Sequence, residues 1–127
     1  MQAHGIIELE VHNKIIILKP HGQFNVEGVY RTIAEIKRLI TGNRLTKWAM
    51  VIEMQGKGTP VGGETLELVK QFPEETEYNG CVFLGCIASS HIQKYVVEQI
   101  TENIFIPQNL FKSTPEAVKW IENHIFS

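Results

Sequence analysis

The chain has 127 residues, a common size for one domain, and we expect residues 1–127 to form a single domain. Its composition is 43% hydrophobic and 20% charged, which excludes a disordered, collagen-like or coiled-coil chain. Twelve lysines and arginines face fourteen aspartates and glutamates, for a net charge of -2. Because this balance supplies no general positive field, we expect no nucleic-acid partner.

The start of the chain and its apolar runs favour a cytoplasmic protein without a membrane span. Residues 1–5 place no basic segment before an apolar stretch. The run Ile15–Leu18 is far shorter than the roughly 18 residues that a spanning helix needs.

The two cysteines, Cys81 and Cys86, fall in one expected strand. Five steps of about 3.3 Å put them roughly 16 Å apart, beyond the reach of a disulfide. The odd spacing predicts opposite faces of the sheet and no shared metal site, so we expect two small buried side chains.

The first part of the chain predicts a hairpin. Gly5–His12 alternates apolar and polar residues, residues 13–14 suit a turn, and Ile15–Leu18 is a more buried strand that we expect to end at Pro20. A helix follows, with Asn25 as its N-cap and Gly42 after its end. Its apolar stripe is Val26, Val29, Tyr30, Ile33, Ile36 and Ile40.

The middle of the chain predicts two strands separated by a loop and a helix. Trp48–Met54 is almost continuously apolar, which indicates a sheet covered on both faces. A glycine-rich loop, Gln55–Gly63, leads to a short helix over Gly63–Phe72, which Pro73 ends. Cys81–Ala88 is the next buried strand.

The last part predicts a helix, a short edge strand within Asn103–Lys112 and a terminal helix. Ser90 and Gln93 form a capping-box pattern, and the stripe that follows is Ile92, Tyr95, Val96 and Ile100. Thr114 is expected to cap the last helix, ahead of Pro115, and its stripe is Val118, Ile121 and Ile125. The order ββαβαβαβα predicts an α/β fold whose sheet is mostly parallel, with one antiparallel strand at the start and helices packed on it.

Three segments resemble the SpoIIAA-like family of small bacterial proteins, whose fold is that of the STAS domain. They are the glycine, capping residue, acid and tyrosine of Gly22–Tyr30, the central strand Cys81–Ala88, and the terminal helix Ser113–Ile121 with Ala117 and Trp120 three apart. The resemblance implies a STAS-like fold and a non-enzymatic regulatory or interaction role.

One motif of that family is missing. STAS antagonists of anti-sigma factors carry an Asp-Ser-Ser-Gly type sequence, whose serine is phosphorylated to release the partner. The corresponding stretch here, Gly56–Thr65, has no serine and no preceding aspartate. The phosphoswitch is therefore not carried over, and Thr59, which precedes Pro60, is interpreted as a helix cap.

The candidate site lies where loops leave the carboxyl ends of parallel strands, the usual place for ligands in open α/β sheets. The candidate ligand-binding residues are Gly58, Thr59, Gly62, Thr65, Leu66, Leu68, Val69, Phe72, Ser89, Ser90, His91 and Tyr95. We predict no catalytic residue, metal ligand or cofactor. The histidines show no metal-ligand spacing, the glycines depart from the dinucleotide pattern, and Ser90 beside His91 lacks a nucleophile elbow.

Three functions compete on this evidence. The leading one is binding of an unknown protein partner; the alternative is a carrier or sensor of a small non-polar ligand held between the second and third helices. An enzyme that uses the loop glycines for a phosphorylated substrate ranks last. Leu68, Val97 and Trp120 are left over from the helical stripes, and they predict a two-fold homodimer.

Overall fold

A tight turn opens the fold. Asn13 has a φ of 56°, a left-handed conformation that asparagine tolerates well, and it joins β1 (Ile6–His12) to β2 (Ile15–His21). The two strands pair antiparallel from Ile6 opposite His21 to His12 opposite Ile15. This is the predicted hairpin.

The structure is a computed structural model that describes residues 6–21, 26–54, 79–102 and 106–127.

The second strand is longer than expected, because it continues through Pro20 to His21. Its parallel pairing with the next strand ends at Leu18 opposite Ile52. Pro20 therefore lies past the end of that ladder, where a missing N–H removes no bond to the neighbouring strand.

The other strands are parallel to β2. They are β3 (Trp48–Glu53), β4 (Cys81–Ile87) and β5 (Gln108–Phe111), and the sheet order is β1-β2-β3-β4-β5. The predicted mixed, mostly parallel sheet with one antiparallel strand is confirmed. The edge strand β5 begins after Ile106, which is buried, so the apolar residue precedes the strand.

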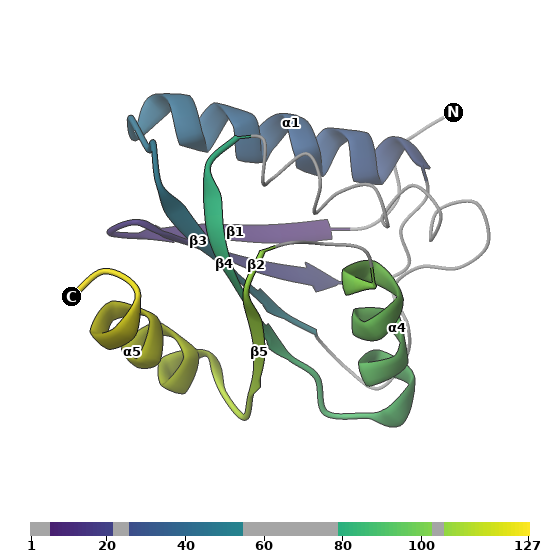
Figure 1. The fold of residues 1–127 in the computed structure, drawn as a ribbon. Helices are drawn as coiled ribbons and strands as arrows, with labels where there is room; N and C mark the ends of the chain where they lie inside the picture. Colours follow the sequence, from purple (N-terminus) through teal and green to yellow (C-terminus); the bar gives the residue numbers. More distant parts are fainter. Residues whose placement is uncertain (1–5, 22–25, 55–78, 103–105) are drawn as a thin grey trace.

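Helices cover both faces of the sheet, as Figure 1 shows. The helices α1 (Val26–Gly42) and α4 (His91–Thr101) lie on one face, and α5 (Thr114–His124) lies on the other. Right-handed crossovers between parallel strands that follow one another in the sheet place their helices on the same face. α5 has no strand after it and packs on the opposite face, against β3, β4 and β5.

Two cores result, one on each face of the sheet. The α1 and α4 side contains Trp48 and Met50, which are almost fully buried, with Val29, Ile36 and Val97 from the helices. The α5 side is smaller and contains Ile15, Ile17, Ala49, Val51, Phe83, Phe111, Ala117 and Ile121. No helix among the described residues has the length and apolar character that a bilayer crossing requires.

The sequence predicted capped starts for two described helices, α4 and α5, and a serine hydroxyl caps each of them. Ser90 Oγ accepts the Gln93 N–H at 3.1 Å, as the capping pattern predicted. The prediction for the last helix was wrong by one residue: Ser113 is the N-cap and accepts the Glu116 N–H at 3.3 Å. Thr114 is inside the first turn, which leaves its hydroxyl available for a tertiary contact.

Three predicted faces were wrong. Tyr30 was assigned to the apolar stripe of α1, but its side chain is 58% exposed, while Thr32 on the same helix is buried. Thr32 can be buried because its hydroxyl donates to the Gly28 carbonyl oxygen at 2.9 Å. Cys81 and Cys86 were placed on opposite faces, but both belong to the α1-side core.

The reason for the cysteine error is a register shift at the start of β4. Trp48 pairs with Cys81 and Ala49 pairs with Phe83, so Val82 is an extra residue in the ladder. A bulge of this kind reverses the alternation of faces. Both cysteines are buried and neither is in a disulfide, as expected.

The third corrected face belongs to α4. Tyr95, a member of its predicted stripe, is 56% exposed, whereas Val97, which was left over, is 7% exposed and part of the core. The buried row is Gln93, Val97 and Thr101, spaced four apart. Thr101 Oγ1 donates to the Val97 carbonyl oxygen at 2.7 Å, so a polar side chain can occupy this row.

Candidate functional site

The predicted site is only partly visible in the structure. Of its candidate residues, Gly58, Thr59, Gly62, Thr65, Leu66, Leu68, Val69 and Phe72 lie outside the described residues, as do the second predicted helix and the stretch that replaces the phosphorylation motif. The described members are Ser89, Ser90, His91 and Tyr95. Ser89, Ser90 and His91 follow β4 at its carboxyl end, and Tyr95 lies within α4.

Their hydrogen bonds show what the two serines do. Ser90 caps α4, and the buried Gln93 turns its Oε1 back to accept from the Ser89 N–H at 2.9 Å and from Ser89 Oγ at 3.2 Å. His91 is exposed at the start of the helix. The two hydroxyls are therefore part of the turn that orders the β4–α4 connection.

Tyr95 is the aromatic member of the group, and its side chain is mostly exposed one turn into α4. Tyr30 on α1 is the other strongly exposed tyrosine of the described chain. Tyrosine is enriched at protein interfaces, since its flat amphipathic ring gives a large contact area at low entropy cost. The described part of the predicted site thus has one exposed aromatic ring, that of Tyr95.

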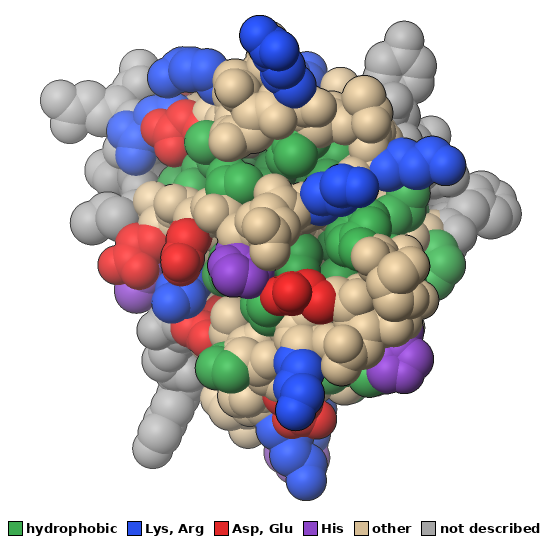
Figure 2. All heavy atoms as spheres, turned by 90° about the vertical axis from the view of Figure 1, so that its left-hand side faces the viewer, with side chains coloured by type: hydrophobic (Ala, Val, Ile, Leu, Met, Phe, Trp, Pro, Cys, Tyr) green, Lys and Arg blue, Asp and Glu red, His purple; other side chains and the backbone are tan. Residues whose placement is uncertain are grey.

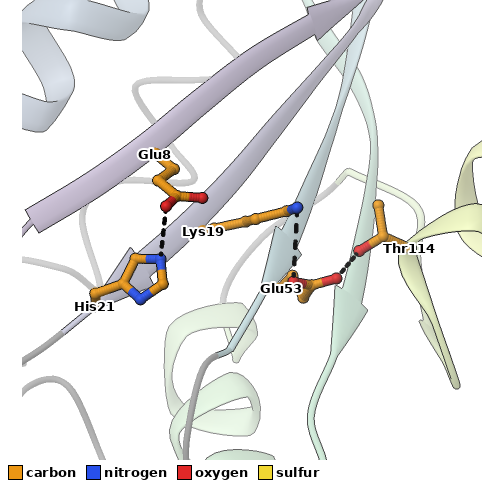
Figure 3. Close-up of polar contacts among 5 residues, drawn as sticks. All are labelled: Glu8, Lys19, His21, Glu53 and Thr114. Atoms are coloured by element: carbon orange, nitrogen blue, oxygen red, sulfur yellow. Dashed lines mark hydrogen bonds and ion pairs between the residues drawn. The ribbon is translucent and has the colours of Figure 1, made fainter.

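A second group of polar side chains lies on the α5 side of the sheet, and the sequence interpretation missed it. Its members are Glu8, Lys19, His21, Glu53 and Thr114, which come from β1, β2, β3 and the first turn of α5 (Figure 3). α5 makes most of its contacts with β3, β4 and β5, and Glu8, Lys19 and His21 lie on the other two strands. We call these five residues the polar cluster.

The centre of the polar cluster is Glu53, at the carboxyl end of β3. Its Oε1 accepts a short hydrogen bond from Thr114 Oγ1, and its Oε2 lies 4.0 Å from Lys19 Nζ. The Glu53 and Lys19 side chains are 23% and 32% exposed. One carboxylate thus connects the last helix to two strands of the sheet.

His21 and Glu8 form the outer part of the polar cluster. His21 Nε2 lies 3.5 Å from Glu8 Oε1 in the β1–β2 hairpin. This nitrogen is buried and makes no hydrogen bond to the described residues. Its contact with Glu8 is an ion pair only when the imidazole carries a proton.

A groove runs beside α5 on the same face. It has a volume of about 470 Å³ and is lined by Glu10, His12, Ile17, Thr114, Pro115, Val118, Lys119, Glu122 and Asn123. We call it the α5 groove. His12 Nε2 and Glu122 Oε1 meet at 3.1 Å across it, joining β1 to the helix. Its lining combines apolar side chains with charged ones of both signs.

Figure 2 shows how charge is distributed on the left-hand side of the view in Figure 1. Acidic, basic and histidine side chains alternate with apolar ones on this face, and no large area has a single sign. Within the parts of the chain that are described, no three His, Cys, Asp or Glu side chains come together as a metal site.

Burial raises the pKa of the Cys86 thiol from 9.0 to about 12, so this thiol is a poor nucleophile.

The aromatic side of α5 is packed within the chain, which corrects the interpretation of Trp120 as a leftover contact residue. Its ring centroid lies 5.0 Å from that of Phe83 and 5.7 Å from that of Phe111, and it stacks on His124 at 4.6 Å. With Val97 in the opposite core, two of the three residues that predicted a homodimer contact are used internally. The third, Leu68, lies outside the described residues.

Sequence alone contained one signal for the polar cluster. The period-two alternation places Glu8 opposite the apolar row of its strand, whereas Lys19 and Glu53 each come at the end of an apolar row. The pattern does not show that their strands lie side by side. It also does not show where α5 packs on this face.

Comparison with known proteins identifies the fold. Neither a protein-family model nor a curated protein matches the sequence. A crystal structure does match: an uncharacterised protein of Shewanella loihica PV-4, described as a DUF3478 family member with a SpoIIAA-like fold. The TM-score is 0.62 at 11% identity, and the match covers 94% of this chain and 95% of that one. The chain therefore has a SpoIIAA-like fold, as its sequence segments suggested.

Proposed function

We propose that this chain is a regulatory or interaction module of the SpoIIAA-like, STAS-related kind, which acts by binding and lacks the phosphorylatable serine motif. The observation that carries the proposal is the match to a SpoIIAA-like structure over 94% of the chain. In this proposal residues 1–127 act as one cytoplasmic domain without a bound cofactor.

The arrangement of the described polar groups supports a binding role. The hydroxyl of Ser90 accepts the helix-capping bond, and the carboxylate of Glu53 is bonded to Thr114 beside Lys19. These contacts join elements of the fold to one another. In contrast, the fold does not require the rings of Tyr30 and Tyr95 to be exposed. In this proposal the two rings belong to the surface that contacts a partner.

A quantitative pull-down tests the partner role. The bait is the full chain, compared with Tyr95→Ser and Tyr30→Ser variants and with an exposed-residue control, Lys112→Ser on the connection before α5. We expect at least one protein to be enriched by the wild type and the control, and to be lost with a tyrosine variant. A partner list that is identical for all four baits would contradict the proposed surface.

Catalysis is tested on the same residues. A panel of esterase, phosphatase and glycosidase substrates is expected to give no turnover that depends on Ser90 or His91. Activity lost in both Ser90→Ala and His91→Ala, with the fold retained, would reverse the proposal.

The alternative proposal is a carrier or sensor of a small non-polar ligand between the second and third helices. Tyr95 is the described residue that still favours it, because its exposed ring lies on the helix that would form one wall. Native mass spectrometry of the purified chain tests it. A bound lipid-like mass that disappears in Tyr95→Ser supports the carrier, and a spectrum of unliganded protein alone contradicts it.

A further inference from the structure

The α5 groove carries unpaired charges of opposite sign on its two walls. Glu10 lies on the β1 wall and Lys119 on the α5 wall, and both side chains are exposed. Within the described chain neither has an ion-pair partner, whereas Glu122 is held by His12, and Glu53 lies beside Lys19. The unpaired charges therefore remain available for a contact outside the protomer.

Apolar side chains add to these charges. Ile17 of β2 and Pro115 and Val118 of α5 also line the groove. An interface needs an apolar centre with polar groups around it. The α5 groove provides both within one patch next to the helix.

We propose that a second copy of this chain occupies the α5 groove in a two-fold homodimer. The ridge of α5 from each protomer lies in the groove of the other, and Lys119 of each protomer meets the partner's Glu10. A two-fold interface uses the same patch on both subunits, so the patch must be complementary to itself. A surface of one sign would repel its own copy, whereas opposite charges on two walls attract it twice.

The charges of the groove also favour a second copy of the chain over a charged peptide as the occupant. A basic peptide would meet the ammonium of Lys119, and an acidic peptide would meet the carboxylate of Glu10. The dimer requires neither a foreign partner nor a ligand, so its failure would leave the proposed function untouched. It also differs from the surface that the sequence predicted, since Val97 is buried and the half-buried Trp120 packs against Phe83 of its own chain.

A charge-swap experiment tests the proposal. The full chain, Glu10→Lys, Lys119→Glu and the double variant are compared by sedimentation velocity from about 1 to 100 μM at low and high salt. Lys94→Glu on α4, an exposed position on the opposite side of the sheet, is the matched control. Circular dichroism and thermal melting verify that each variant is folded.

We expect the wild type and Lys94→Glu to sediment at about twice the chain mass of 14.4 kDa. Each single swap replaces two attractive contacts by two repulsive ones, so its dissociation constant should rise about tenfold or more. The double variant re-creates both pairs with the signs exchanged, and it should return to within about threefold of the wild type.

Three outcomes would overturn the proposal. One is a wild-type chain that stays monomeric at the highest concentration. Another is a dimer that both single swaps leave intact. The last is a double variant that stays monomeric although it is folded, because the singles would then have acted through something other than the Glu10–Lys119 pair.

Discussion

The Oγ1 hydroxyl of Thr114 donates a hydrogen bond to Oε1 of Glu53, which fastens the first turn of α5 to the carboxyl end of β3. The contact joins residues that are 61 positions apart in the chain. Thr114 is 9% exposed, and the Glu53 side chain is 23% exposed. The polar cluster therefore contributes to the stability of the fold, although part of it lies at the surface.

Replacing Thr114 by valine should destabilise the protein. Valine keeps the shape of threonine but removes the hydroxyl that donates to Glu53 Oε1. We expect a loss of about 1–2 kcal/mol in the free energy of unfolding, measured by urea denaturation. Thr114→Ser keeps the hydroxyl and should cost less than about half of that. Equal stability of Thr114→Val and the wild type would show that the bond contributes nothing.

Replacing Gly80 by alanine should be far more damaging. Gly80 has a φ of +99°, and a Cβ at this position would lie 2.1 Å from the carbonyl oxygen of Thr46. Its own carbonyl accepts the Trp48 N–H at 3.1 Å, which places the start of β3 beside β4. Because the clash is with backbone, we expect a loss of about 3 kcal/mol or more in the free energy of unfolding, or no folded protein.

Gly42→Ala is the matched control for that substitution. A Cβ at Gly42, at the end of α1, would meet no atom within 4 Å. Alanine favours the helix over glycine, so stability should be unchanged or rise by up to about 1 kcal/mol. Two glycine substitutions of similar effect would contradict this account of Gly80.

The stability of the protein should fall at high pH because of Cys86. Burial raises the pKa of its thiol from 9.0 to about 12. Between these values the unfolded chain releases the proton and the folded chain keeps it, so the unfolded state is favoured as the pH rises. The contribution is a loss of about 1.4 kcal/mol per pH unit between pH 9 and 12.

Cys86→Ala identifies that contribution. Urea denaturation from pH 8 to 10.5 should give a shallower decline for the variant than for the wild type, although the variant is less stable at pH 8 because it leaves a small cavity. Parallel declines would contradict the burial of the thiol. The same burial predicts that thiol reagents label Cys86 only after denaturation.

Ser90 should contribute to stability through its cap. Ser90→Ala removes the acceptor for the Gln93 N–H and should cost about 1 kcal/mol in thermal or urea unfolding. Ser90→Asp keeps an acceptor at the N-cap and should recover most of that loss. Aspartate would not replace a serine nucleophile, so recovery by Ser90→Asp separates a capping hydroxyl from a reacting one.

The sequence by itself determined the order of the described elements and the class of the sheet. The change from period two in β1 to period three and four in α1 records which side chains face water, and that exposure is a local property of each element. The turn at Asn13 and the cap at Ser90 also depend only on neighbouring residues. These features were therefore predictable without knowledge of the fold.

Tertiary structure decided which face of a helix was buried when that face included polar residues with hydrogen-bond partners in the same helix. Thr32 and Thr101 are buried because each hydroxyl donates to a carbonyl one turn earlier in its helix. Because hydropathy treats threonine as an exposed residue, the predicted apolar stripes of α1 and α4 were rotated from the buried faces. They therefore placed Tyr30 and Tyr95 in the core. Similarly, the extra residue Val82 brought both cysteines to one face.

The sites on the α5 side depended entirely on the tertiary structure. Glu53 meets Thr114, His12 meets Glu122, and Trp120 meets Phe83 across long separations in the chain. Each pair exists because α5 packs on this face of the sheet, with most of its contacts to β3, β4 and β5. The position of a helix on a sheet is set by packing among side chains from many segments, and no local pattern contains that information.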